Sequence, residues 1–196
     1  MSADVSRRDL LNTAARGTVL AVLGGGAGFL VTKANGQIVW QVDAARCINS
    51  RVGETGVPAC NLCTTECVVA LSAVRAVNDH ARCGRCNMCP AYFKITSPVD
   101  SHGYPSEKLC PRDAILRRPI GRMDPEDPAN NFYEYLIDEA KCDGCGKCVM
   151  QCKDPLGLGS ITLRVRYDIC KNCNRCAIST ACPRNAVLEL PRDQAI

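Results

Sequence analysis

Residues 142–152 read CDGCGKCVMQC, and residues 170–183 read CKNCNRCAISTACP. In each stretch three cysteines are separated by two residues each, and a fourth follows at Cys152 or Cys182. A short loop with this spacing suits three thiolates wrapped around a metal centre better than disulfides between distant strands. These two stretches therefore predict that the cysteines bind metal.

The two stretches closely resemble the ligand runs of bacterial two-cluster ferredoxins. In those proteins each run gives three thiolates to one [4Fe-4S] cluster and its fourth to the other cluster. The resemblance implies two ligand sets in this half of the chain: Cys142, Cys145, Cys148 and Cys182, and Cys170, Cys173, Cys176 and Cys152. The sequence departs from the pattern at Lys153, which follows the first run where proline is usual.

An internal repeat extends the pattern to the first half of the chain. WQVDAARC (40–47) parallels EYLIDEAKC (134–142), and LCPRDAILRRP (109–119) parallels ACPRNAVLELP (181–191). Repetition at this scale indicates a duplicated unit. Alignment on the repeated ends predicts eight further ligands, Cys47, Cys60, Cys63, Cys67, Cys83, Cys86, Cys89 and Cys110. Two loops are longer than in the second half, one at residues 48–59 and one of twenty residues before Cys110.

The repeat predicts an α+β fold of two tandem ferredoxin-like modules, at residues 35–122 and 134–196, joined by a polar linker at 123–133. Metal–thiolate bonds would supply much of the folding energy that such small cores lack. Within the first module we expect Cys47, Cys60, Cys63 and Cys110 to hold one cluster, and Cys83, Cys86, Cys89 and Cys67 the other. A nested alternative pairs the first run with the fourth and the second with the third, as many four-cluster subunits do, and it stays open.

The N-terminus contains an export pattern. Ser6-Arg7-Arg8-Asp9-Leu10-Leu11 is a twin-arginine motif, and an apolar, glycine-rich run follows at 17–32. That run is short for a membrane span. We expect residues 1–34 to be a twin-arginine signal that directs the protein to the periplasm, with a short membrane anchor as the alternative. Export of a folded protein suits a cofactor that is inserted in the cytoplasm.

The remaining residues offer no catalytic site. The two histidines, His80 and His102, lie in polar, irregular sequence, and no phosphate-binding loop or activated nucleophile is present. The formal charge of +4 does not support nucleic-acid binding, because sixteen thiolates on four clusters would make the loaded protein acidic. We expect no small-molecule substrate and no enzymatic activity of the chain's own.

Taken together, the motif and the cysteine runs resemble exported ferredoxin-type subunits of bacterial respiratory systems, such as periplasmic nitrite and nitrate reductase pathways. The resemblance implies electron transport through four [4Fe-4S] clusters between a membrane quinol oxidoreductase and a periplasmic reductase or cytochrome. Alternatives are an iron–sulfur subunit of a molybdopterin oxidoreductase, a structural or assembly protein, and a zinc site. For docking we consider the inserted loop at 48–59 and the basic residues Arg117, Arg118 and Arg122.

Overall fold

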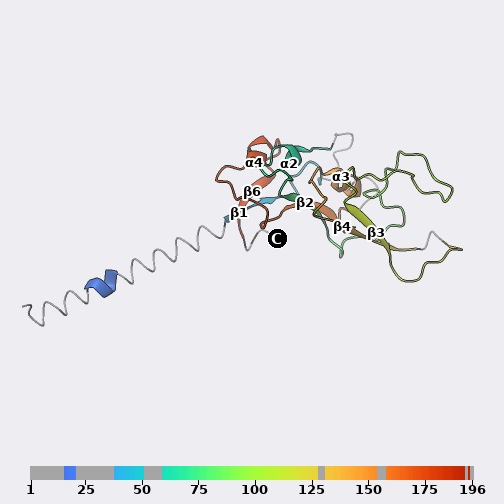
Figure 1. Cartoon of the computed structure of the whole chain (residues 1–196), viewed down its shortest axis with the longest axis horizontal. Coiled ribbons are helices and arrows are strands. Elements are labelled where there is room, and N and C mark those ends of the chain that lie inside the picture. Colours follow the sequence, from blue (N-terminus) through green and yellow to red (C-terminus); the bar gives the residue numbers. More distant parts are fainter. Residues whose placement is uncertain are drawn as a thin grey trace, which may run out of the picture. The chain divides into compact units, whose positions relative to one another are not determined.

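The computed structural model describes residues 16–20, 38–50, 59–127, 131–153, 158–192 and 194 (Figure 1). Residues 16–20 are helical and exposed, whereas the twin-arginine motif and the rest of the expected signal segment lie outside the described residues. Within those ranges no helix is both long and apolar enough to span a membrane. Residues Trp40–Glu189 form one compact unit, which contains all sixteen cysteines.

Six strands of five residues each pair into three two-stranded sheets in the described part of the chain. The pairs are nested: β1 with β6, β2 with β5 and β3 with β4. The strand bounds are Ile38–Val42 (β1), Val74–Asn78 (β2), Ile115–Pro119 (β3), Tyr133–Ile137 (β4), Ile161–Val165 (β5) and Val187–Pro191 (β6). Three short helices begin one or two residues after a cysteine, at Leu62–Thr65 (α2), Lys147–Lys153 (α3) and Ala177–Ala181 (α4).

The nested pairing corrects the expected arrangement of two tandem modules. Every sheet joins one strand from residues 35–122 to one strand from 134–196, so neither stretch folds around its own strands alone. Pairing across the halves gives each of the six strands a hydrogen-bonded partner. Short strands can pair with several partners, so packing of the whole unit decides which pairs form.

The β2–β5 sheet is the middle one of the three nested pairs. Its antiparallel register places Val74 opposite Val165, Ala76 opposite Leu163 and Asn78 opposite Ile161. Because side chains alternate along a strand, these six residues share one face of the sheet. Five of the six are buried, and Leu163 and Val74 are each only 1% exposed. This face therefore forms the middle of the hydrophobic core.

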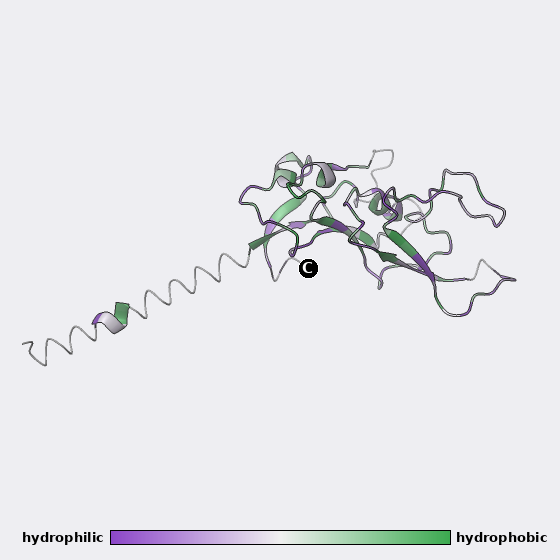
Figure 2. Ribbon diagram, viewed as in Figure 1, coloured by the Kyte–Doolittle hydropathy of each residue, from purple (hydrophilic) through white to green (hydrophobic). Residues whose placement is uncertain are grey.

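Further buried residues from the helices and outer strands complete that core. Val149 of α3, Ile178 of α4 and Val187 of β6 are buried, as are Tyr133 and Tyr135 of β4. Phe132, beside these two tyrosines, is 57% exposed. β3 passes from hydrophobic at its start to hydrophilic at its end (Figure 2).

Replacement of Leu163 tests the central position of the β2–β5 sheet. Leu163→Ala should destabilise the protein by about 2–5 kcal/mol, because it leaves a cavity in the middle of the core. Arg164→Ala is the matched control, since Arg164 is the next residue on β5 and is exposed. Thermal unfolding followed by circular dichroism should show a lower midpoint for Leu163→Ala only. Equal unfolding midpoints for the two variants would contradict the central position of Leu163 in the core.

Candidate metal centres

The sixteen cysteines gather in groups of four around cavities. We name each cavity after the middle cysteine of its C-x2-C-x2-C or equivalent triplet. The Cys60 cavity is lined by Cys47, Cys60, Cys63 and Cys182. The Cys86 cavity is lined by Cys83, Cys86, Cys89 and Cys152. The Cys145 cavity is lined by Cys142, Cys145, Cys148 and Cys110, and the Cys173 cavity by Cys170, Cys173, Cys176 and Cys67.

The structure brings each predicted triplet together but corrects the origin of every fourth cysteine. Cys67 faces the triplet at 170–176 instead of the one at 83–89, and Cys110 faces 142–148 instead of 47–63. Cys152 and Cys182 likewise join triplets from the first half. The first run is thus combined with the fourth and the second with the third, which is the nested alternative. The reason is the strand pairing. Cys67 precedes β2 and Cys170 follows β5, and the antiparallel register brings these two ends of the strands together.

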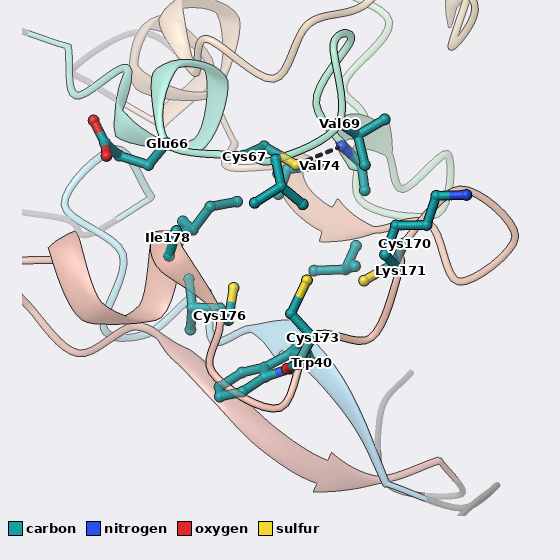
Figure 3. A pocket seen from close by; sticks show the side chains of 15 residues that line it. Trp40, Glu66, Cys67, Val69, Val74, Cys170, Lys171, Cys173, Cys176 and Ile178 are labelled. Atoms are coloured by element: carbon teal, nitrogen blue, oxygen red, sulfur yellow. Dashed lines mark hydrogen bonds between the residues drawn. The ribbon is translucent and has the colours of Figure 1, made fainter.

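The Cys173 cavity shows the common geometry most clearly. The sulfur atoms of Cys67, Cys170, Cys173 and Cys176 point toward a shared space (Figure 3). Trp40 packs at its border, and its indole Nε1 donates a hydrogen bond to the carbonyl oxygen of Cys173 at 2.8 Å. The other lining residues are mainly apolar and include Val74, Val165 and Ile178. Such a lining limits the access of water to the sulfur atoms.

Left-handed backbone conformations recur at equivalent positions of the triplets. The second residue between the first two cysteines has a positive φ in three of them, at Arg85 (52°), Gly144 (77°) and Asn172 (46°). A residue in this conformation turns the chain sharply, so that successive cysteines face the same space. Gly144 has a second constraint, because a Cβ there would lie 2.5 Å from the carbonyl oxygen of Val74.

The repeated sequence Cys-Pro-Arg-Asp/Asn-Ala also has a structural explanation. Asp113 and Asn185, each three residues after its cysteine, have positive φ values of 49° and 48°. The turn directs the next N–H back to the sulfur atom: Ala114 N lies 3.4 Å from Cys110 Sγ, and Ala186 N lies 3.3 Å from Cys182 Sγ. Asp and Asn tolerate this conformation better than most residues, which accounts for their place in both repeats.

Backbone N–H groups reach three other sulfur atoms. Ala73 donates to Cys67 Sγ, Ala76 to Cys142 Sγ and Asn172 to Cys170 Sγ, each at 3.4 Å. An N–H group directed at sulfur stabilises the thiolate form and tunes the potential of a bound iron–sulfur cluster. Two of these donors come from β2 or the residue before it, so this strand supports two cavities at once.

Burial raises the pKa of at least one cysteine thiol in each of the four cavities. Desolvation raises the pKa of Cys63 to about 12, with smaller contributions from Cys47, Cys60 and Cys182. Desolvation likewise raises the pKa of Cys89 to about 12, and that of Cys148 well above its usual value. Four thiolates in one apolar cavity therefore need a positively charged core, which would offset both the desolvation and their mutual repulsion.

The donor set fits an iron–sulfur cluster: four sulfur atoms around an apolar space, with backbone N–H groups directed at sulfur. In the described ranges no group of three or more His, Cys, Asp or Glu side chains has the arrangement of a site for a single metal ion. His80 and His102 are both exposed and line none of the four cavities.

A buried asparagine, which the sequence analysis missed, closes the long first loop. Asn49 is 1% exposed; its Nδ2 donates to the carbonyl oxygen of Cys60 at 2.8 Å, and its Oδ1 accepts from the Cys60 N–H at 2.9 Å. These two bonds hold Cys60 near Cys47 although thirteen positions separate them. One asparagine in a polar insertion gives no recognisable signal. Residues 51–58, expected to contact a partner, lie outside the described residues.

Comparison with known protein families finds no match for this chain, and no solved structure matches it.

Two glycines with similar backbone angles provide a test of the close contact at the Cys145 cavity. Gly144 and Gly121 have φ values of +77° and +75°, but only Gly144 has a neighbour where a Cβ would lie. Replacement by alanine should cost about 1–2 kcal/mol at either site from the left-handed conformation alone. Gly144→Ala should cost more and reduce the iron content of the purified protein, whereas Gly121→Ala should retain it. Equal iron contents and melting temperatures would show that the contact with Val74 is unimportant.

Proposed function

We propose that this protein carries four [4Fe-4S] clusters, one in each cysteine-lined cavity, and relays single electrons between redox proteins. The observation that carries the proposal is the repeated quartet: three cysteines from one loop and a fourth from another run, around an apolar space. This three-plus-one exchange is the ligand pattern of two-cluster ferredoxins. Here it occurs twice.

A bound cluster would supply reversible one-electron chemistry, and the residues of the chain would set its conditions. The cysteine thiolates would hold the irons, and the apolar lining would limit water access. N–H groups such as those of Ala73, Ala76 and Ala114 would stabilise the added negative charge. No side chain in the described residues is needed for proton transfer or for substrate binding in this role.

The β2–β5 sheet supports an order for the four centres. Its outer pairs line the end cavities: Val74 and Val165 the Cys173 cavity, and Asn78 and Ile161 the Cys86 cavity. Its central pair lines the two others, since Leu163 lines the Cys60 cavity and Ala76 the Cys145 cavity. Successive positions on this face are about 7 Å apart. This supports an order in which the Cys60 and Cys145 cavities lie between the other two.

Contacts between loops support the same order. Ile178 and Val187 line both the Cys173 and the Cys60 cavity. A Cβ on Gly146, in the Cys145 loop, would lie 3.3 Å from the carbonyl oxygen of Cys60. Tyr135 lines the Cys86 cavity, and Ile137, two residues along β4, lines the Cys145 cavity. Each centre therefore has a neighbour on the path from one end to the other.

The two end cavities have exposed apolar residues in their walls. Val68, at the Cys173 cavity, is 67% exposed, and Leu158, at the Cys86 cavity, is 63% exposed. These ends are suited to electron entry and exit. On the resemblance to exported respiratory subunits, one partner is a membrane quinol oxidoreductase and the other is a periplasmic reductase or cytochrome. A subunit of a molybdopterin oxidoreductase would use the same relay.

Iron and acid-labile sulfide analysis tests the cofactor content directly. Protein purified without oxygen should contain about sixteen irons and sixteen sulfides per chain, from four clusters of four. A redox titration followed by electron paramagnetic resonance should show these centres accepting and releasing single electrons. Far fewer irons would defeat the four-cluster proposal, and centres that stay inert over the physiological range would favour a structural role.

Serine substitutions test the grouping of the fourth ligands. If the Cys173 cavity is as described, Cys67→Ser and Cys173→Ser should alter the resonance of the same centre. Cys86→Ser is the matched comparison, because pairing within the first half of the chain would make Cys67→Ser alter the Cys86 centre instead. That second outcome would overturn the nested arrangement while leaving four clusters in place.

A further inference from the structure

Arg117 of β3 is enclosed by aromatic rings. Its guanidinium carbon lies 3.4 Å from the centroid of the Tyr133 ring, 5.0 Å from that of Tyr104 and 5.1 Å from that of Phe93. Arginine cations are attracted to the faces of aromatic rings, and the attraction strengthens as water is excluded. The side chain is half-buried. The structure therefore corrects the idea that Arg117 belongs to an open basic docking surface.

The guanidinium is hydrogen-bonded to the ligand loop of the Cys86 cavity. Arg117 Nη2 donates to the backbone oxygen of Asn87 at 3.0 Å and to its Oδ1 at 3.1 Å. The Tyr104 hydroxyl donates to the same Oδ1 at 2.8 Å. Tyr135 donates to the carbonyl oxygen of Cys86 at 2.8 Å. The positively charged guanidinium is thus hydrogen-bonded to the two-residue segment between Cys86 and Cys89.

The long segment between Cys89 and Cys110 supplies two of the three rings. Phe93 and Tyr104 both come from it, and they stack with centroids 5.7 Å apart. Relative to the second half of the chain, this segment is an insertion that the ligand count alone does not require. The contacts that hold Arg117 against the Asn87 backbone give this inserted segment a structural role.

Arg117 makes no ion pair with a carboxylate among the described residues, where it donates hydrogen bonds to the two oxygens of Asn87. Its Nε is buried and has no hydrogen-bond partner in the same part of the chain. A cation that no acidic side chain neutralises, and that aromatic rings shield from water, acts on nearby charge over a longer distance than an exposed one. Its hydrogen bonds to Asn87 connect it to the loop of the Cys86 cavity, where a cluster would gain negative charge on reduction.

We propose that Arg117 raises the reduction potential of the centre in the Cys86 cavity, an inference that rests on the function proposed above. When that centre accepts one electron from the neighbouring centre, the neighbour is oxidised and the Cys86 centre gains one negative charge. No bond or proton is transferred. The nearby guanidinium stabilises the reduced form more than the oxidised form, so electrons collect at this end of the relay.

Potentiometric titration of three variants, monitored by electron paramagnetic resonance, tests this role. Arg117→Gln removes the charge but keeps hydrogen-bond donors, and Arg117→Lys keeps the charge. Arg118→Gln is the matched control, because Arg118 is the next residue on β3 and is exposed. Arg117→Gln should make reduction of one centre about tenfold less favourable, a shift of about 59 mV for a one-electron couple. Arg117→Lys should restore most of the potential, and Arg118→Gln should leave all potentials unchanged.

The outcomes separate this inference from the proposed function. A wild-type protein without clusters would defeat the function itself. If the wild type has four clusters and Arg117→Gln titrates identically, only the role of Arg117 is overturned. If Arg117→Gln fails to assemble its clusters, Arg117→Lys decides: a potential near the wild-type value supports the charge effect. A lowered potential in Arg117→Lys, with full iron content, would show that packing and not charge matters.

Discussion

Backbone hydrogen bonds between β2 and β5 tie the first half of the chain to the second, and the positions of the cysteine quartets follow from them. Ala76 stands opposite Leu163 at the centre of this sheet, and each of these two residues lines one cysteine cavity. The outer pairs reach the remaining two cavities. A shift of either strand by one residue would turn its three lining side chains to the opposite face.

Charge is the second constraint on this unit. Two cations in the described part of the chain are more deeply buried than Arg117: Arg75 is 2% exposed and Lys153 is 6% exposed. Arg75 donates to the carbonyl oxygens of Val74 and Glu139, and Lys153 Nζ donates to that of Ile48 at 3.1 Å. Val74 and Ile48 themselves line cysteine cavities. Buried cations that bind carbonyl groups beside these cavities are suited to balance the negative charge that loaded clusters would bring.

Described residues of both insertions in the first half of the chain contact the cysteine-containing loops. Asn49, at the start of one, holds Cys60 in place through paired hydrogen bonds. Phe93 and Tyr104, from the other, hold Arg117 against Asn87. Neither role follows from the local sequence, because single polar or aromatic residues in a loop do not indicate what they will contact. Lys153, in the position where proline is usual, is explained in the same way by a contact from the other half of the chain.

The sequence by itself determined the cysteine triplets and the two Cys-Pro-Arg turns, because these depend on neighbouring residues. Spacing of two residues and a left-handed residue at Gly144 or Asn172 are enough to bend a loop around one space. Only the tertiary structure decided which fourth cysteine completes each quartet, in what order the quartets lie and where Arg117 is placed. The physical reason is that five-residue strands of similar composition can form the same backbone hydrogen bonds with several partners. The choice among those partners is made by packing across the whole unit, which local sequence does not record.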